Sequence, residues 1–177
     1  MYMTNSELKS LRGQLSDIYR DMRNVCMTRR HYDQKLRTVQ HVNTWYEGLL
    51  AVGTSGTVAG WSFWKEATGQ AIWIGVGVFV SILSIIKPII RLSEEVKRLS
   101  TLAAKYAALQ VDFQLLVFDI KADCGLSESS RKIYKEICKK MTDLGEREDT
   151  PPSEKRLAKL CEQVNREFPP SSFWSPE

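Results

Sequence analysis

Two uncharged, largely apolar stretches follow one another in the middle third of the chain, over residues 48–64 and 67–86. With their natural flanks they extend over residues 42–64 and 70–90. An α-helix rises about 1.5 Å per residue, so each stretch reaches roughly 30 Å, the thickness of the hydrocarbon core of a bilayer. The pattern predicts a hairpin of two transmembrane helices around an external turn at residues 65–69.

Small residues form a stripe along the first predicted span. In water, a glycine in a helix interior costs about 1 kcal/mol, whereas in lipid small residues let helices approach closely. We expect this stripe to be a packing face or part of a pore lining. The alternative is a soluble helical hairpin with an unusually apolar core. The stripe consists of Gly53, Gly56, Thr57 and Gly60.

Tryptophans and basic residues mark the ends of the predicted hairpin. Trp45, Trp64 and Trp73 lie near the ends of the spans, where an indole ring favours the membrane interface. Lys and Arg flank the open end of the hairpin on both sides, whereas the turn holds only Lys65. The chain carries a net charge of +4, and the basic excess lies in residues 1–41. This asymmetry predicts that both termini lie in the cytoplasm.

Apolar residues recur in alternating steps of three and four residues on either side of the hairpin, over residues 8–43 and 92–120. This spacing is typical of a coiled-coil seam. It predicts two long cytoplasmic helices, residues 1–41 and 91–125, that pair antiparallel and continue the hairpin.

A straight hairpin centred on the turn brings the two seams into register. It places Arg29 opposite Tyr106 and Gln110 opposite Val25. Polar residues in such a seam commonly set its register; the alternative is that Arg29 belongs to a ligand site. A second apolar stripe beside the later seam needs a cover, either from the C-terminal segment or from other subunits: Leu102, Leu109 and Leu116.

The C-terminal segment, residues 126–177, is expected to form short helices. Ser127 is a good cap for a helix that reaches about Gly145, and the prolines at 151 and 152 separate it from a last amphipathic helix. The tail ends in two aromatic residues, Phe173 and Trp174, which either dock on a neighbour or insert at an interface.

One ionisable residue lies within each predicted span, Glu47 in the first and Lys87 in the second. A symmetric hairpin places them at similar depth near the cytoplasmic side. Because a charge inside a membrane is costly, it tends to face protein or water. We expect a Glu47–Lys87 ion pair; the alternative is that both side chains reach independently to the headgroups.

A group of basic residues lies next to the predicted membrane. Its default role is to bind anionic lipid, and the alternative is a phosphate-bearing ligand held between subunits. The group consists of Arg29, Arg30, Lys35, Arg37, Lys97, Arg98 and Lys105.

Catalytic and metal-binding motifs are not recognisable in the sequence. The four cysteines form no C-x-x-C, and neither His31 nor His41 has the spacing of a catalytic or zinc site. A thin helical hairpin also leaves little room for a pocket. We therefore expect a protein that is not an enzyme and has neither a cofactor nor a metal.

The arrangement resembles the SLATT family of two-transmembrane effectors. The resemblance rests on the long helix before the first span, the close hairpin around Lys65 and Glu66, the long helix after Lys87 and Pro88, and the break at residues 122–126. It implies a bacterial inner-membrane protein that forms oligomeric pores in antiphage defence. The resemblance also implies control by a nucleotide or oligonucleotide signal from a partner nucleotidyltransferase.

These observations predict an all-α membrane protein, a transmembrane hairpin continued into a cytoplasmic antiparallel coiled coil. We expect a homo-oligomer, taken as a tetramer, that acts as a gated pore. A membrane-anchored scaffold that recruits a soluble partner is the competing interpretation, and a phage-type lysis protein ranks third.

Overall fold

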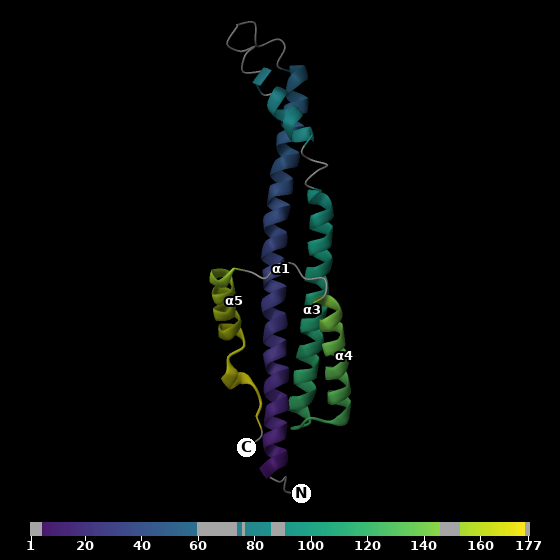
Figure 1. Ribbon diagram of the computed structural model, residues 1–177, viewed down its shortest axis with the longest axis vertical. Coiled ribbons are helices and arrows are strands. Elements are labelled where there is room, and N and C mark those ends of the chain that lie inside the picture. The colour runs from purple at the N-terminus through teal and green to yellow at the C-terminus, as the bar shows by residue number, and fades with distance from the viewer. Residues whose placement is uncertain (1–4, 60–73, 76, 86–90, 146–152, 176–177) are drawn as a thin grey trace. The chain divides into compact units, whose positions relative to one another are not determined.

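The computed structural model describes residues 5–59, 74–75, 77–85, 91–145 and 153–175. Within these ranges the regular structure is helical and contains no strand, which confirms the expectation of an all-α protein. The longer helices are α1 (Asn5–Ala59), α3 (Leu92–Ala122), α4 (Glu128–Gly145) and α5 (Glu154–Glu167), and a short 3-10 helix follows at Pro170–Ser172 (Figure 1).

Helix α1 runs without interruption through 55 residues and continues from the first predicted arm into residues of the first predicted span. Between Gly13 and Gly48 its sequence contains neither glycine nor proline, so nothing there breaks the helix. The structure therefore joins residues 5–41 and 42–59, which the sequence assigned to separate segments, in one helix.

The two ends of α3 have definite backbone signals. Arg91 has φ 47°, and its carbonyl accepts hydrogen bonds from the amides of Glu94 and Glu95 at 3.0 and 3.1 Å. These two acidic residues in the first turn also suit the positive end of the helix dipole. Cys124 has φ 47° at the other end, where the amide of Gly125 bonds the carbonyl of Ile120 at 3.2 Å.

The chain divides into two compact units, Met1–Asp33 with Thr101–Glu177 (unit 1) and Gln34–Ser100 (unit 2). The core of unit 1 contains seam residues from both long helices, among them Ile18 and Met22 on α1 and Phe113 and Ile120 on α3, all buried. The coiled-coil spacing therefore did mark the buried face of each helix.

Helix α4 packs along α3 in unit 1. Lys140 donates to Asp112 at 2.8 Å, and the rings of Tyr134 and Phe113 meet edge to face with centroids 6.4 Å apart. The second apolar stripe is buried inside the unit, and Leu109 lines the same hollow as Leu144 of α4. The cover for this stripe thus comes from the C-terminal segment of the same chain.

Helix α5 and the tail pack against the first 33 residues (Figure 1). Leu160 and Val164 of α5 are buried. Phe173 stacks on Tyr19 with ring centroids 4.1 Å apart, and the Tyr19 hydroxyl donates to the carbonyl of Trp174 at 3.1 Å. The aromatic tail therefore docks on α1 of its own chain.

The predicted register of the two arms is wrong by about one helical turn. Arg29 donates to Gln110 at 2.8 Å, and Tyr106 stacks on Tyr32 with centroids 5.6 Å apart. The prediction assumed helices that run straight from the turn. Arg91, the residue before α3, has a left-handed backbone, which does not fit the straight helix that the count assumed.

In unit 2, residues 77–85 of the second apolar stretch lie beside α1. Residues 77–85 are helical, and the Tyr46 hydroxyl of α1 donates to the carbonyl of Leu83. Ser81 and Ser84 each donate to the carbonyl four residues earlier, at 2.8 and 2.9 Å, so their hydroxyls are satisfied within their own helix.

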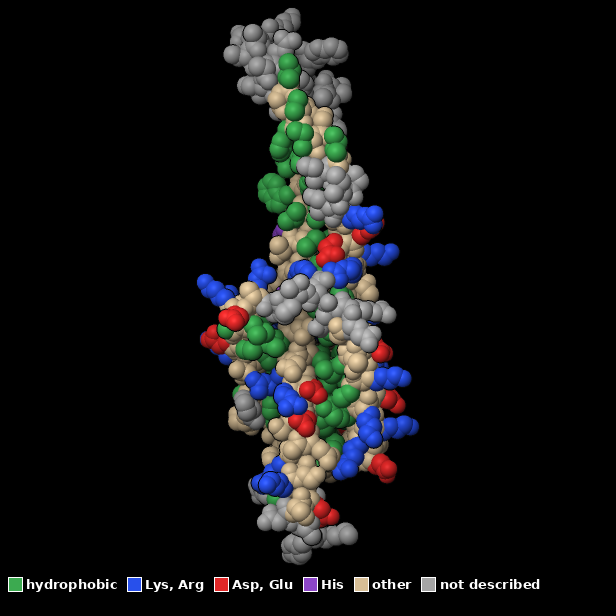
Figure 2. Space-filling view, viewed as in Figure 1, with side chains coloured by type: hydrophobic (Ala, Val, Ile, Leu, Met, Phe, Trp, Pro, Cys, Tyr) green, Lys and Arg blue, Asp and Glu red, His purple; other side chains and the backbone are tan. Residues whose placement is uncertain are grey.

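Large apolar side chains are exposed on both segments of this pair. Trp45 is 73% exposed on α1, and Ile85 is 67% exposed on the second segment. Figure 2 shows hydrophobic side chains gathered along the visible face of this helix pair. Among the described residues of unit 2, these exposed side chains are Val42, Trp45, Leu49, Ile74, Val78, Phe79, Ile82 and Ile85.

Among the residues that the structure describes, no helix combines the length and the apolar character needed to cross a bilayer. The predicted external turn at residues 65–69 lies outside the described residues, as do residues 60–64, 70–73, 76 and 86–90 of the two predicted spans.

Candidate functional site

The predicted basic group divides between the two units. Arg29, Arg30 and Lys105 belong to unit 1. The other members, Lys35, Arg37, Lys97 and Arg98, belong to unit 2. Each part is therefore considered within its own unit.

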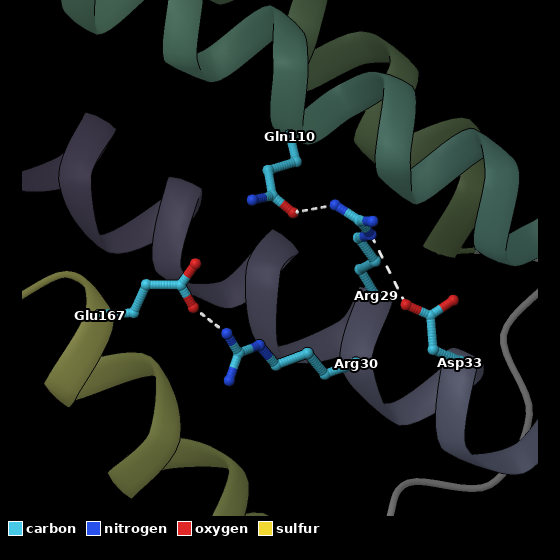
Figure 3. Close-up of polar contacts among 5 residues, drawn as sticks. All are labelled: Arg29, Arg30, Asp33, Gln110 and Glu167. Carbon is cyan, nitrogen blue, oxygen red and sulfur yellow. Dashed lines mark hydrogen bonds and ion pairs between the residues drawn. The ribbon is translucent and has the colours of Figure 1, made fainter.

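Arg29 is half-buried and bound on two sides by its own chain. Its guanidinium donates to the amide oxygen of Gln110 at 2.8 Å, and its Nε lies 3.6 Å from a carboxylate oxygen of Asp33 (Figure 3). A neutral acceptor and an acidic one thus hold this cation between α1 and α3. Its observed role is to link the two helices, as expected of a polar residue in a helical seam.

Arg30 links α1 to α5. Its guanidinium forms a charge-assisted hydrogen bond with Glu167, the last residue of α5 (Figure 3). Two helical turns earlier on α1, Arg23 donates to Asn165 of α5. A phosphate that bound Arg29 or Arg30 would have to displace these acceptors.

Cys26 lies buried beneath these arginines. Burial raises the pKa of its thiol, and the positive charges of Arg30 and Arg29 offset part of that effect. The protonated thiol is therefore favoured near neutral pH, and Cys26 acts as a small apolar core residue.

Lys105 does not face a purely basic surface. It lines an open hollow between α3 and α4 together with Asp112, Lys140 and Asp143. Asp112 pairs with Lys140 there and raises the pKa of that ammonium group. Two cations and two carboxylates balance, so this hollow has no net preference for an anion.

The unit 2 members are mainly exposed. Arg98 forms two hydrogen bonds with Glu95, one turn earlier on α3, at 2.9 and 2.8 Å. Arg37 and Lys97 are exposed, and Lys35 is half-buried. Such solvated cations are suited to a diffuse anionic surface rather than to one fixed ligand.

The residues predicted to act within the membrane lie partly outside the described residues. Glu47 is exposed on α1, but Lys87 is not described, so the ion pair stays a prediction. Gly53, Gly56 and Thr57 belong to α1. Gly60 is not described, and the packing or pore role of the stripe also stays a prediction.

A second basic group, absent from the predicted set, surrounds the docked tail. Arg12, Arg20 and Arg23 line an open hollow on α1 whose other wall is formed by Phe173 and Trp174. A signal was present in the sequence, because spacings of eight and three residues place the three arginines near one face of a helix. The tail that completes the hollow comes from the other end of the chain, and no local pattern predicted its position.

Helix α4 is fixed to α1 by a half-buried polar contact. The Tyr134 hydroxyl donates to a carboxylate oxygen of Asp21 at 2.6 Å. Burial is the main cause that raises the pKa of Tyr134, and the hydrogen bond to Asp21 adds to it. The neutral phenol is thereby favoured as the donor to this carboxylate.

Within the described residues, no cluster of His, Cys, Asp or Glu side chains is arranged to hold a metal ion. Comparisons with models of protein families, with curated proteins and with solved structures found no match. The resemblance to the SLATT family therefore stays a prediction from the sequence, and function is argued from the residues themselves.

Proposed function

We propose that the protein is an oligomeric effector of the bacterial inner membrane, with residues 42–64 and 70–90 as two spans and both termini in the cytoplasm. It acts as a gated pore under the control of a nucleotide signal. The interpretation follows the SLATT resemblance, and the observation that carries it is the exposed apolar surface on both segments of unit 2.

That surface is unusual for a protein in water. Eight large apolar side chains are exposed among the described residues of unit 2, and they lie on two segments joined by the Tyr46–Leu83 hydrogen bond. Water-soluble monomers rarely expose contiguous apolar surfaces beyond a few hundred Å². Hydrocarbon is the environment that would make this surface favourable.

Unit 1 supports self-association. One face of α3 carries an exposed row with steps of four, three, four, three and four residues, which is the spacing of a coiled-coil seam. Phe118 is 69% exposed and Leu115 60%. The row consists of Ala104, Ala108, Val111, Leu115, Phe118 and Ala122.

In the proposed assembly this row, here called the α3 row, meets the same row of other subunits. Subunits in one bilayer share one orientation. Each residue of the α3 row therefore faces the same residue of the other subunits, around an axis that runs along α3. Several subunits are required, because two spans cannot enclose a channel.

The α3 row also favours the second candidate, a membrane-anchored scaffold. In that case the spans serve as an anchor, and the row binds a soluble helical partner through its apolar side chains. The two candidates share their topology and differ in conductance.

Planar bilayers separate them. Purified protein should give discrete conductance steps, and the variant Phe118→Asp should reduce their frequency because it places a charge in the subunit interface. The control Ile133→Asp alters an apolar residue of α4 that is 39% exposed and lies outside the row. Intact oligomers without conductance, with and without nucleotides, would favour the scaffold.

A further inference from the structure

We propose that the hollow between the start of α1 and the C-terminal tail binds a nucleotide, with its phosphates on Arg12, Arg20 and Arg23 and its base against Trp174. The biological role of this site rests on the proposed function, whereas the evidence that the hollow binds a nucleotide comes from residues of unit 1 alone. Arg29 and Arg30 link α1 to Gln110 of α3 and to Glu167 of α5, whereas Arg20 makes its ion pairs within α1.

The charge of the hollow is the first support. Among the described residues, its lining includes three arginines and no acidic residue. Asp17 is the nearby competitor, since it pairs with Arg20 at 2.9 Å, and Asp21 lies 3.9 Å from the same guanidinium. The Arg20–Asp17 pair is open to solvent, with side chains 67% and 53% exposed, and such a pair yields readily to a multivalent anion.

Arg23 supplies the second support. Its terminal nitrogen donates to Asn165, but its Nε is buried and has no hydrogen-bond partner among the described residues. A buried donor without an acceptor is uncommon in folded proteins. A phosphate oxygen in the hollow would satisfy it once the Arg23 side chain turns away from Asn165 and into the hollow, since guanidinium groups bind phosphate through paired N–H donors.

The aromatic wall is the third support. Phe173 is already stacked on Tyr19, with an interplanar angle of 7°, so this ring pair is rigid. Trp174 follows it, half-buried in the wall of the hollow, with its carbonyl held by the Tyr19 hydroxyl. An indole face beside three arginines suits a ligand that has both a planar base and phosphates, since bases stack on aromatic rings.

The arrangement also couples the ligand to the tail. The phosphate-binding residues lie on α1, whereas the stacking residues lie at the end of the chain. A bound nucleotide therefore bridges the two, and its binding energy stabilises the docked position of the tail.

The test is calorimetric titration of the full-length protein, in nanodiscs of phosphatidylcholine alone, with each of the four ribonucleoside triphosphates and with inorganic tripolyphosphate. At least one nucleotide should bind saturably and more tightly than tripolyphosphate. Arg20→Gln and Arg23→Gln should each weaken its binding about tenfold or more, because each removes charged hydrogen bonds. Trp174→Ala should weaken the nucleotide and leave tripolyphosphate unchanged.

Two further variants make the test specific. Asp17→Asn removes the carboxylate that competes for Arg20 and should tighten binding. The matched control Arg131→Gln with Lys132→Gln removes two exposed cations of α4 that do not line the hollow, and it should leave binding unchanged.

Three results would overturn the inference: no saturable binding of any nucleotide up to about 1 mM, equal losses in the control variant, or equal binding of tripolyphosphate and nucleotide. The titration is repeated in nanodiscs that include phosphatidylglycerol. If this lipid competes with the nucleotide, and the competition is lost in Arg20→Gln, the phosphate site belongs to lipid headgroups. Binding is measured without conductance, so a protein that conducts but does not bind overturns this inference and leaves the proposed pore intact.

Discussion

At the scale of single residues, Cys124 is the clearest point of strain. It has φ 47° at the end of α3, while the amides of Cys124 and Gly125 bond the carbonyls of Lys121 and Ile120. These two bonds form the Schellman motif, in which glycine is the usual residue at the left-handed position. The sequence suggested Gly125 as the end of the helix, but the structure places the left-handed conformation one residue earlier.

Replacing Cys124 by glycine should therefore stabilise unit 1. Glycine adopts this conformation without a Cβ clash, and the gain is expected to be about 0.5–1 kcal/mol. Cys124→Gly and Cys124→Ala should be compared by chemical unfolding under reducing conditions. Both variants remove the thiol, and only the glycine relieves the strain, so equal stabilities would contradict the account.

Tyr134 makes the fold sensitive to alkali. Because its pKa is raised in the folded state, chiefly by burial, the folded protein holds this proton more tightly than the unfolded chain. The stabilisation is fully present below the unfolded value of about 10 and is lost as the pH rises above it toward the folded pKa. Tyr19, Cys26 and Cys138 have raised pKa values as well and act in the same direction.

The variant Tyr134→Phe should accordingly show a smaller loss of stability between pH 8 and pH 11 than the parent protein. At pH 8 it should be less stable by about 1–3 kcal/mol, since Asp21 loses a half-buried donor. Urea unfolding at the two pH values measures both effects. An unchanged pH dependence in the variant would show that Tyr134 is not a source of the alkaline sensitivity.

At the scale of elements, α5 is held by two kinds of contact that differ in strength. Leu160 is 1% exposed, whereas the Arg30 and Glu167 side chains that form the ion pair are 33% and 47% exposed. An exposed ion pair contributes little, roughly 0–1 kcal/mol, while a buried leucine truncated to alanine costs about 2–5 kcal/mol. Apolar packing should therefore dominate the docking of this helix.

Limited proteolysis and hydrogen exchange at residues 153–167 test this order. Leu160→Ala should increase exchange in α5 strongly, and Arg30→Gln should increase it only slightly. Leu157→Ala is the matched control, because Leu157 lies on the same helix but is 38% exposed. A larger effect from Arg30→Gln than from Leu160→Ala would reverse the assignment.

The positions of the helices were largely predictable, because they depend on local signals. The seam spacing marked the buried faces of α1 and α3, α4 ends at Gly145, and α5 begins after the prolines at 151 and 152, as expected. The register was not predictable, because the count assumed one straight helical path on both sides of the turn, and the left-handed backbone of Arg91 departs from such a path.

The contacts of the candidate site were predictable only in part. The sequence singled out Arg29 as a polar residue in the seam, but its partner Gln110 lies 81 residues away and depends on the register. The same holds for Arg30 and Glu167, and for the hollow around Arg20 that the tail completes. Such sites are made by long-range packing, which residue spacing within one helix does not contain.

At the scale of the whole molecule, the α3 row predicts how subunits meet. A double variant Leu115→Asp, Phe118→Asp should lower the mass of the detergent-solubilised particle toward that of the monomer, because it places charges along an apolar seam. Light scattering coupled to size-exclusion chromatography measures that mass. Single cysteines in a Cys-free background test the relative orientation of the subunits. Because subunits in one bilayer lie parallel, each of Ala104→Cys, Val111→Cys and Phe118→Cys should cross-link to the same position of a neighbouring subunit.

Insertion into lipid is the claim on which the pore and its alternative both depend. A charged side chain at the centre of a span makes insertion of that span less favourable by about 2.5–3.5 kcal/mol. Ile82→Lys places such a charge on an apolar side chain that is 50% exposed, and Ile133→Lys is the control in unit 1.

The most direct measurement is extraction of vesicles that contain the protein with alkaline carbonate and, separately, with high salt. The protein and the Ile133→Lys control should stay in the membrane pellet until detergent is added, and Ile82→Lys should shift toward the supernatant. Release of the unaltered protein by carbonate or salt alone would contradict the account at its centre.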